Sequence, residues 1–422
     1  MESFFDTKHL YRSYFKMALP VVLGLAVTLV YNLADTFFIA QTNDTNLIAG
    51  VSLCAPVFTT LMAFGNIYGQ GGSSLNSRML GQNDLDGTAR ISAFSFYIAI
   101  ATGAVLAVVM TLFRSPLLTL LGASAETLDY AQSYYTVLTL CAPIIVLSFI
   151  HSNLVRCEGL ANESMIGTIL GAVVNIILDP ILISGLGMGA LGAAVATVIG
   201  LSVKLSQCHV RADELRQILG VGITAALSNL MQSLTVIVIN QFLLAYGNDK
   251  IAAMGIVLKV NMIAQLILTG FAFGGVPMYG YLYGAKQQDT LKKLLRFCLL
   301  FLCGLSLALT AFLCLAATPL MRLFVQDSAL VATGAEMLRW QAATAVFAGI
   351  VLLLTVLFQA TGKIVPAFLL SISRQGIVFI VVLVVCVRLF AYNGVIMAQA
   401  VADVLSAILA LGLLIGYNPL KQ

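Results

Sequence analysis

The sequence predicts an all-α polytopic membrane protein with twelve transmembrane helices, in two six-helix lobes related by pseudo-two-fold symmetry along the membrane normal. Three observations predict this fold: an apolar composition, twelve apolar runs and an internal repeat. Of the 422 residues, 60% are hydrophobic and 9% are charged, and the mean hydropathy is +0.99. Soluble domains carry about 25% charged residues. The net charge of +4 is small and lies in loops, so the expected partner is the lipid bilayer and no nucleic acid is expected.

A helix needs about 20 apolar residues to cross a bilayer. The runs that approach or exceed this length are 17–40, 47–72, 91–113, 128–150, 164–185, 188–204, 218–246, 251–276, 294–317, 337–358, 364–388 and 394–416. Most Lys and Arg residues outside the runs fall on the amino-terminal side of the membrane, with Arg374 counted there as a loop residue. The positive-inside rule then places both termini in the cytoplasm. The segment before Met17 shows no cleavage pattern, so we expect the first span to be retained.

The repeat is visible as glycines that recur at one constant spacing. The pairs, each 203 residues apart, are Gly71 and Gly274, Gly72 and Gly275, Gly81 and Gly284, and Gly159 and Gly362. Each repeat holds six spans, so both repeats enter from the same side, and a substrate path is expected between the two bundles. The predicted lobes are residues 1–204 and 218–422, joined by a cytoplasmic linker at 205–217. Because the sixth run and this linker are short, either residues are missing around 204–210 or a short span ends in the linker.

The sequence gives no sign of a catalytic or metal site. The eight Cys residues form no CxxC pair and the three His residues are scattered, so buried thiols are the simpler interpretation. The chain contains no GxSxG, HExxH or Walker pattern. An intramembrane enzyme or a channel is therefore the least favoured class, and no cofactor is predicted.

Asp35 is the residue on which the functional hypothesis depends. It lies in the stretch Tyr31–Ala40, which closes the first span. An ionised Asp at the centre of a span costs about 2.5–3.5 kcal/mol, and such residues usually titrate, pair or bind a cation. The alternative is a buried carboxylate that bonds Asn32 or Thr36 and holds the fold.

Asp179 forms a second candidate with Asn175 and Pro180. Asn175 and Asp179 are four residues apart and so share a helix face, and Pro180 frees the carbonyl of Ile176 from its helical bond. These oxygen atoms suit a proton or Na⁺, and two carboxylates close together in a low dielectric cannot both ionise easily. The alternative is a helix kink with a satisfied Asp near the interface.

The repeat does not duplicate these groups. At the spacing of 203 residues, Asp35 corresponds to Val238 and Asp179 to Val382. We therefore expect the ion chemistry to lie in the amino-terminal lobe alone.

Other polar residues in the spans have weaker assignments. Candidates for a substrate cavity are Asn32, Gln232, Asn261 and Gln265, although hydrogen bonding between helices explains them at least as well. Pro20 is a candidate hinge because an interior proline kinks a helix.

Asp403 lies in the last span, and Lys259 in span eight is its only expected cationic partner within the membrane. We expect either a structural ion pair or separate snorkelling toward water; a role in transport is the less favoured alternative. Pro180 is the second candidate hinge.

The chain resembles the multidrug and toxic compound extrusion (MATE) family over nearly its whole length. The resemblance rests on the turns Gly81-Gln82 and Gly284-Ala285 and on the segments Arg156–Gly159, Asn175–Pro180 and Gly189–Thr197. It is most similar to the DinF-like branch. That resemblance implies a cation site formed by Asp35, Asn175, Asp179 and Thr197, and a first-span proline, Pro20, that bends on protonation. The NorM-like branch adds acids in spans seven and ten; here span seven has none and Glu336 lies at the mouth of span ten, so a sodium site in the carboxy-terminal lobe is not expected.

The resemblance implies an antiporter that exports organic, often cationic, compounds across the bacterial inner membrane. H⁺ is favoured as the coupling ion, with Na⁺ at Asp35 and Asp179 as the alternative. A monomer without a prosthetic cofactor is expected. A lipid-linked precursor flippase of the same superfamily is the alternative function; it would need arginines facing the central cavity, and no Arg is expected deep in a span.

Overall fold

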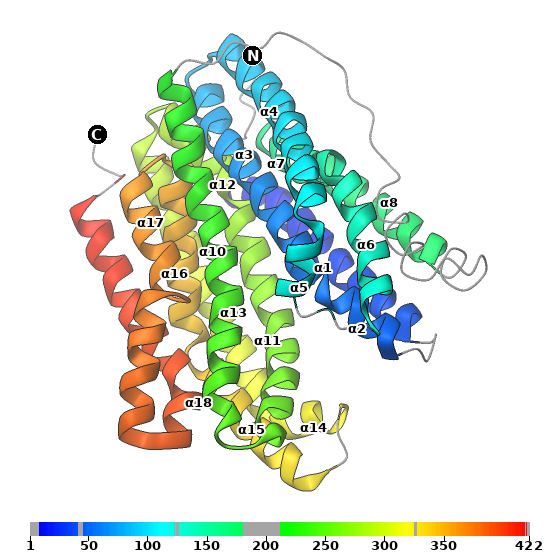
Figure 1. Cartoon of the computed structure of the whole chain (residues 1–422). Coiled ribbons are helices and arrows are strands. Elements are labelled where there is room, and N and C mark those ends of the chain that lie inside the picture. The colour runs from blue at the N-terminus through cyan, green and yellow to red at the C-terminus, as the bar shows by residue number, and fades with distance from the viewer. Residues whose placement is uncertain are drawn as a thin grey trace. The chain divides into compact units, whose positions relative to one another are not determined.

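The computed structural model describes residues 8–40, 45–121, 123, 126–179, 212–324, 327–417 and 419. Within these ranges the regular elements are helices, and no strand occurs in them (Figure 1). The helices are α1 (Leu10–Ala40), α2 (Thr45–Leu53), α3 (Ala55–Gly81), α4 (Leu85–Leu112), α5 (Arg114–Leu120), α6 (Leu128–Leu140), α7 (Ala142–Cys157), α8 (Ala161–Asp179), α10 (Ala212–Leu244), α11 (Asn248–Gly274), α12 (Val276–Gly284), α13 (Gln288–Leu315), α14 (Ala317–Arg322), α15 (Ser328–Ala343), α16 (Ala345–Ala360), α17 (Ile364–Ser373) and α18 (Ile377–Gly416).

Six stretches of the described helices are long and apolar enough to cross a membrane. The number rises to eight when two bent pairs are each taken as one span: α6 with α7, bent by 57°, and α15 with α16, bent by 45°. The predicted run 188–204 and the segment around 204–210 lie outside the described residues. The chain is therefore a multi-pass membrane protein, as its composition predicts.

The chain folds into two compact units. Unit 1 comprises Met1–Val22 and Ile223–Gln422, and unit 2 comprises Leu23–Gly222. Helices α1 and α10 each change unit along their length, so the first turns of α1 belong to unit 1 and the first turns of α10 belong to unit 2.

Helix bounds confirm the repeat that the glycines predict. Both ends of α4 and of α13 lie 203 residues apart, and so do both ends of α7 and of α16. Gly159 (φ 88°) and Gly362 (φ 71°) both take the left-handed conformation, two residues after the ends of α7 and α16 respectively. Glycine is the usual residue there because it has no Cβ to clash. The backbone bonds match as well: Gly159 N–H donates to Arg156, and Gly362 N–H donates to Gln359.

Gly71 and Gly274, a repeated pair, each lie where another helix passes very close. In unit 2, a Cβ on Gly71 of α3 would lie 2.1 Å from the carbonyl oxygen of Ile218 in α10. In unit 1, a Cβ on Gly274 of α11 would lie 2.4 Å from Cα of Ala18 in α1. Small residues permit such close approach of membrane helices. Close packing therefore explains why glycine occurs at both positions of this pair.

The first two turns of α10 also form polar bonds with α3 and α4 within unit 2. Arg78 of α3 donates to Gln217 at 2.9 Å, and Arg90 of α4 pairs with Glu214 at 3.1 Å. Glu214 is buried and lies in the first turn of its helix, where the helix dipole favours an acid. These bonds fix the entry of the chain into its second half.

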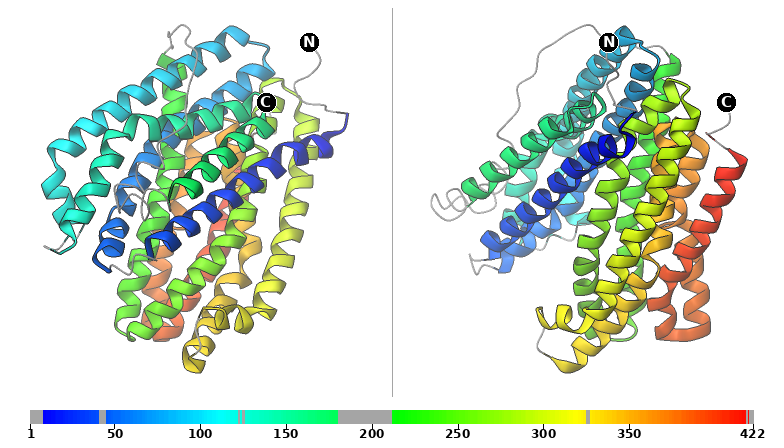
Figure 2. Two further views of the ribbon diagram at one scale, coloured as in Figure 1. Left: turned by 90° about the vertical axis from the view of Figure 1, so that its right-hand side faces the viewer. Right: turned by 180° about the vertical axis from the view of Figure 1, so that it is seen from behind.

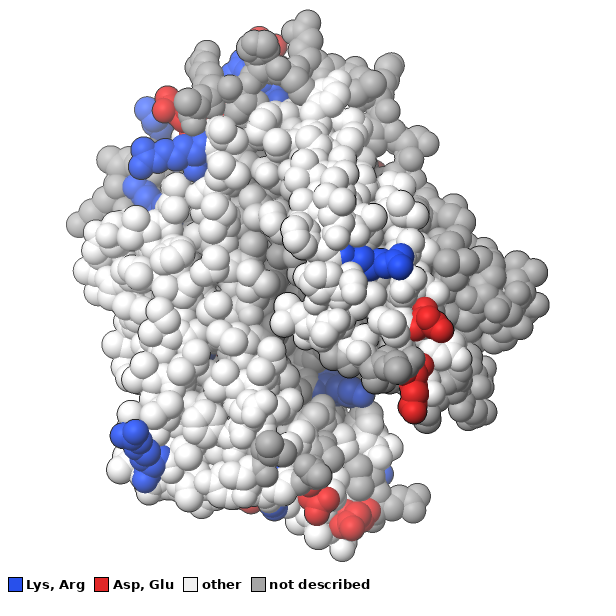
Figure 3. Space-filling model, viewed as in Figure 1, with Lys and Arg blue, Asp and Glu red and all other residues white. Residues whose placement is uncertain are grey.

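In unit 1, α16, α17 and α18 contact one another pairwise, and the right-hand view of Figure 2 shows the orange and red helices of this region side by side. On the left of Figure 3, the surface of this bundle is white between the charged groups near its two ends. Such an apolar side is suited to lipid.

Candidate functional site

Three of the four residues predicted to form the cation site fall on two helices of unit 2. Asp35 falls in α1, and Asn175 and Asp179 fall in the last turns of α8. The positions of these three side chains, and that of Asn32, lie outside the described part of the structure, as do Pro180 and Thr197. The helical backbone keeps Asn175 and Asp179 on one face; whether that face meets Asp35 stays a prediction.

Pro20 is buried in the interior of α1. A proline at this position removes one helical hydrogen bond and leaves the carbonyl of Lys16 without its usual donor. The helix nevertheless continues to Ala40. Pro20 lies three residues before the position at which α1 passes from unit 1 to unit 2, and its role as a hinge stays a prediction.

The candidate cavity residues that can be placed lie on α10 and α11. Gln232 is exposed on α10, while Asn261 and Gln265 are half-buried on α11. Their exposure is compatible with a substrate path and with the helix contacts considered above. Lys259, also on α11, is exposed.

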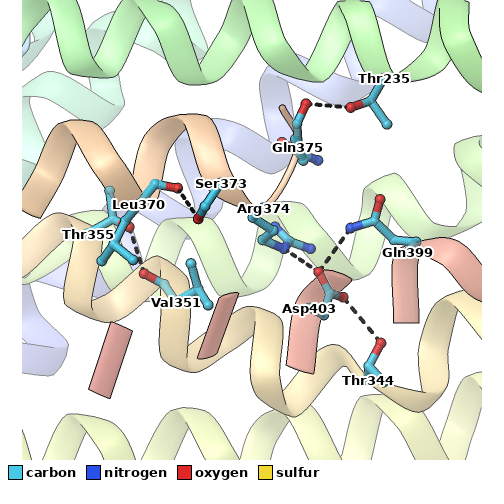
Figure 4. Close-up of polar contacts among 10 residues, drawn as sticks. All are labelled: Thr235, Thr344, Val351, Thr355, Leu370, Ser373, Arg374, Gln375, Gln399 and Asp403. Atoms are coloured by element: carbon cyan, nitrogen blue, oxygen red, sulfur yellow. Dashed lines mark hydrogen bonds and ion pairs between the residues drawn. The ribbon is translucent and has the colours of Figure 1, made fainter. Parts of the chain in front are cut away.

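A buried polar cluster in unit 1 surrounds Asp403, a residue of α18 that is 1% exposed. Its Oδ1 accepts a bond from Nε of Arg374 at 2.8 Å and one from Nε2 of Gln399 at 2.9 Å. Its Oδ2 accepts a bond from Oγ1 of Thr344 at 3.2 Å. We call Asp403, Arg374, Gln399 and Thr344 the Asp403 cluster (Figure 4).

Arg374 reaches Asp403 because the helix is interrupted between α17 and α18. Residues 374–376 form this break, and a Cβ at Gly376 would lie 2.3 Å from the carbonyl oxygen of Ile372, so only glycine fits. The break frees backbone groups that need partners within the membrane. Thr235 of α10 supplies one by donating to the carbonyl of Gln375 at 2.6 Å (Figure 4).

Removing this donor gives a first prediction. Thr235→Val keeps the shape of the side chain but leaves the carbonyl of Gln375 without its partner. We expect a loss of about 1–3 kcal/mol in the free energy of unfolding, the cost of an unsatisfied buried polar group, measured by denaturant titration in detergent. Thr111→Val is the control, because its hydroxyl bonds only the carbonyl of Ala107 in its own helix; equal losses in the two variants would contradict the prediction.

The cluster corrects two expectations from the sequence. Arg374 is not a cytoplasmic loop residue; it lies inside the apolar stretch Ile364–Gly416, and its charge is tolerated there because Asp403 neutralises it. Lys259 is not the partner of Asp403. The spacing of Gln399 and Asp403, four residues apart on one helix, is the sequence signal that could have indicated a polar network here.

The Asp403 cluster is an internally neutral arrangement with three donors on one carboxylate. Its counterparts at the spacing of 203 residues are Gly200, Gly171, Ala196 and Cys141, so it has no equivalent in the other repeat. Among the described residues, no group of three or more His, Cys, Asp and Glu side chains could hold a metal ion. The bonds of this cluster can hold the helices that they join in fixed positions.

Comparison with known proteins gives matches over the whole chain. A family model described as MatE matches residues 20–181 and again residues 224–385, close to the 203-residue spacing. Multidrug export protein MepA of Staphylococcus aureus (strain NCTC 8325 / PS 47) is 31% identical over 434 residues, covering 97% of this chain and 94% of its own. The protein of the same name from Staphylococcus haemolyticus (strain JCSC1435) is 30% identical with the same coverage.

Solved structures match the fold equally completely. One, the outward-facing conformation of a multidrug resistance MATE family transporter of the MOP superfamily, has a TM-score of 0.90 and 25% identity, covering 100% of this chain and 99% of its own. Another, a MOP superfamily transporter from Pyrococcus furiosus Vc1 (DSM3638), has the same TM-score, identity and coverage. The twelve-helix, two-lobe fold expected from the sequence is thereby shown.

Proposed function

The chain belongs to the MATE family, and from this premise we propose that it is a cation-coupled antiporter that exports organic, often cationic, compounds. The relatives named above are multidrug export proteins. Members of this family are transporters and not enzymes, so we assign no catalytic residue and no prosthetic cofactor.

The observation that carries the coupling proposal is the acidic pair present in one repeat and missing from the other. Asp35 lies on α1 and Asp179 on α8, both in unit 2, and their counterparts in the second repeat are Val238 and Val382. In the proposal Asn175 and Thr197 complete the site, and Pro20 and Pro180 allow the helices to bend. The ion drives export by binding one conformation more tightly than the other.

We propose H⁺ as the coupling ion, with Na⁺ as the competing assignment. The membrane potential contributes about 2.3 kcal/mol per elementary charge per 100 mV, so one or two ions per cycle support a useful gradient of exported compound. The bacterial inner membrane, cytoplasmic termini and a monomeric state belong to the same proposal.

Ion gradients imposed one at a time test this proposal. Purified protein in proteoliposomes is loaded with ethidium, a permanently cationic dye, and efflux is followed by fluorescence. We expect a pH gradient alone to accelerate efflux and a sodium gradient alone to leave it near the level of protein-free vesicles. Acceleration by sodium alone would reassign the ion, and no response to either gradient would overturn the coupling proposal.

The lipid-linked precursor flippase is less favoured. It calls for arginines that face a cavity and bind pyrophosphate. Arg374 lies within an apolar stretch, but its guanidinium pairs with Asp403 at 2.8 Å and its side chain is 15% exposed.

A further inference from the structure

Asp403 bonds to two places at which spans of unit 1 are broken. Thr344 is the residue between α15 and α16, the bent pair with an angle of 45°. Arg374 is the residue that follows α17, at the break before α18. One carboxylate on α18 therefore accepts bonds from both breaks.

Further bonds support each break from a different helix. Thr310 of α13 donates to the carbonyl of Ala342 at 2.8 Å, two residues before Thr344. Thr235 of α10 donates to the carbonyl of Gln375, directly after Arg374. Interrupted helices persist in a membrane only where the freed backbone groups find partners. Each break is thus stabilised by a side chain from another helix.

From these contacts we propose that Asp403 and Arg374 are positioning residues for transport: their ion pair holds the two broken spans of unit 1 together. They act through the helices and do not contact the exported compound. The inference rests on the proposed export function, and it adds a charged element in the repeat that lacks the acidic pair.

Removing either partner of this ion pair is expected to disturb the packing of both broken spans strongly, because the pair is buried. Both side chains are mostly buried, at 15% exposure for Arg374 and 2% for Asp403. Removing one partner leaves an uncompensated buried charge, whereas removing both charges leaves none. A double variant is therefore expected to recover what each single variant loses.

The test uses four variants of the full-length protein in proteoliposomes: Asp403→Asn, Arg374→Gln, the double variant and Asp289→Asn. Asp289 is the matched control, because its side chain is 93% exposed in a surface pair with Lys292. We expect each single cluster variant to slow the maximal rate of ethidium efflux about tenfold or more, with the dye Kd within about twofold of the parent, and the double variant to return within about threefold of the parent rate. The control should not differ from the parent.

Three results would overturn the inference. The first is parent-like efflux in both single variants. The second is a double variant no faster than the singles. The third is a dye Kd that rises by the same factor by which the efflux rate falls, which would make the cluster a substrate-binding site.

Hydrogen exchange gives a readout that does not need transport. We expect faster amide exchange in segments 342–347 and 371–378 of Asp403→Asn and unchanged exchange in the control. If the parent itself moves no dye, the proposed function fails while this measurement still decides the inference; unchanged exchange would defeat the inference even where export is normal.

Thr344→Val covers the case in which the charge variants do not reach the membrane. It removes one bond to Asp403 without leaving a buried charge unpaired. We expect about threefold slower efflux and faster exchange in segment 342–347; parent-like values of both would count against the inference.

Discussion

Asp35→Asn is expected to reduce export about 100-fold or to background while the protein still folds and inserts. The amide cannot release a proton, so the ion loses its differential affinity for the two conformations. Coupling free energies of about 1–3 kcal/mol correspond to 5–150-fold effects, and we expect loss of the proposed ion site to lie at the upper end. The measurement is dye efflux in energised cells, with protein in the membrane fraction quantified in parallel.

Asp129→Asn is the control for this variant, since Asp129 is an exposed acid in the first turn of α6 in unit 2. It should export as the parent does. Full drug resistance in cells that carry Asp35→Asn would refute the assignment of Asp35 as the coupling residue.

Gly222→Ala is expected to cause the largest loss of stability among simple substitutions in unit 2. The added Cβ would lie 1.8 Å from the carbonyl oxygen of Ile67, a backbone atom that cannot rotate away. Helices α3 and α10 would have to separate at the contact that Gly71 also forms. Overpacking typically costs 1–3 kcal/mol and occasionally more, and we expect about 3 kcal/mol or more here, measured by denaturant unfolding in detergent.

Gly304→Ala provides the comparison for this substitution. Gly304 lies in α13, and nothing lies within 4 Å of the Cβ it would gain. Alanine is favoured over glycine in a helix by about 0.8–1.0 kcal/mol, so this variant should be as stable as the parent or more stable. Equal stability of the Gly222 and Gly304 variants would show that the α3–α10 contact can relax.

The repeat could be predicted from sequence because backbone geometry restricts which residue fits. Gly159 and Gly362 take positive φ after matching helices, and Gly71 and Gly274 lie where a neighbouring backbone leaves no room for a Cβ. These requirements act at single positions, so they leave a pattern in the sequence at constant spacing.

The ion pair of Arg374 with Asp403 could not be predicted because it depends on a helix break and on a partner distant in sequence. The charge pattern alone favours a loop position for Arg374, and a lone Arg is costly in a span. What makes it tolerable is Asp403, 29 residues further along the chain and on a different helix. The bend at Thr344 likewise has no proline beside it, whereas Pro143, in the first turn of α7, does mark the bend at Cys141.

The proposed cation site remains a prediction in its side-chain geometry. The structure confirms helical backbone at Asp35, Asn175 and Asp179, as the apolar runs predict. The assembly of these side chains with Thr197 rests on the family resemblance and on the asymmetry between the repeats.

Proton release on substrate binding tests the central claim most directly. The purified protein in weakly buffered detergent solution is mixed with ethidium, and released protons are measured with a pH-sensitive dye. The account predicts release of about one or two protons per protein from the parent, in line with a site of two carboxylates, and less release from both Asp35→Asn and Asp179→Asn. Dye binding without proton release, at constant sodium, or release that is unchanged in both variants, would contradict it.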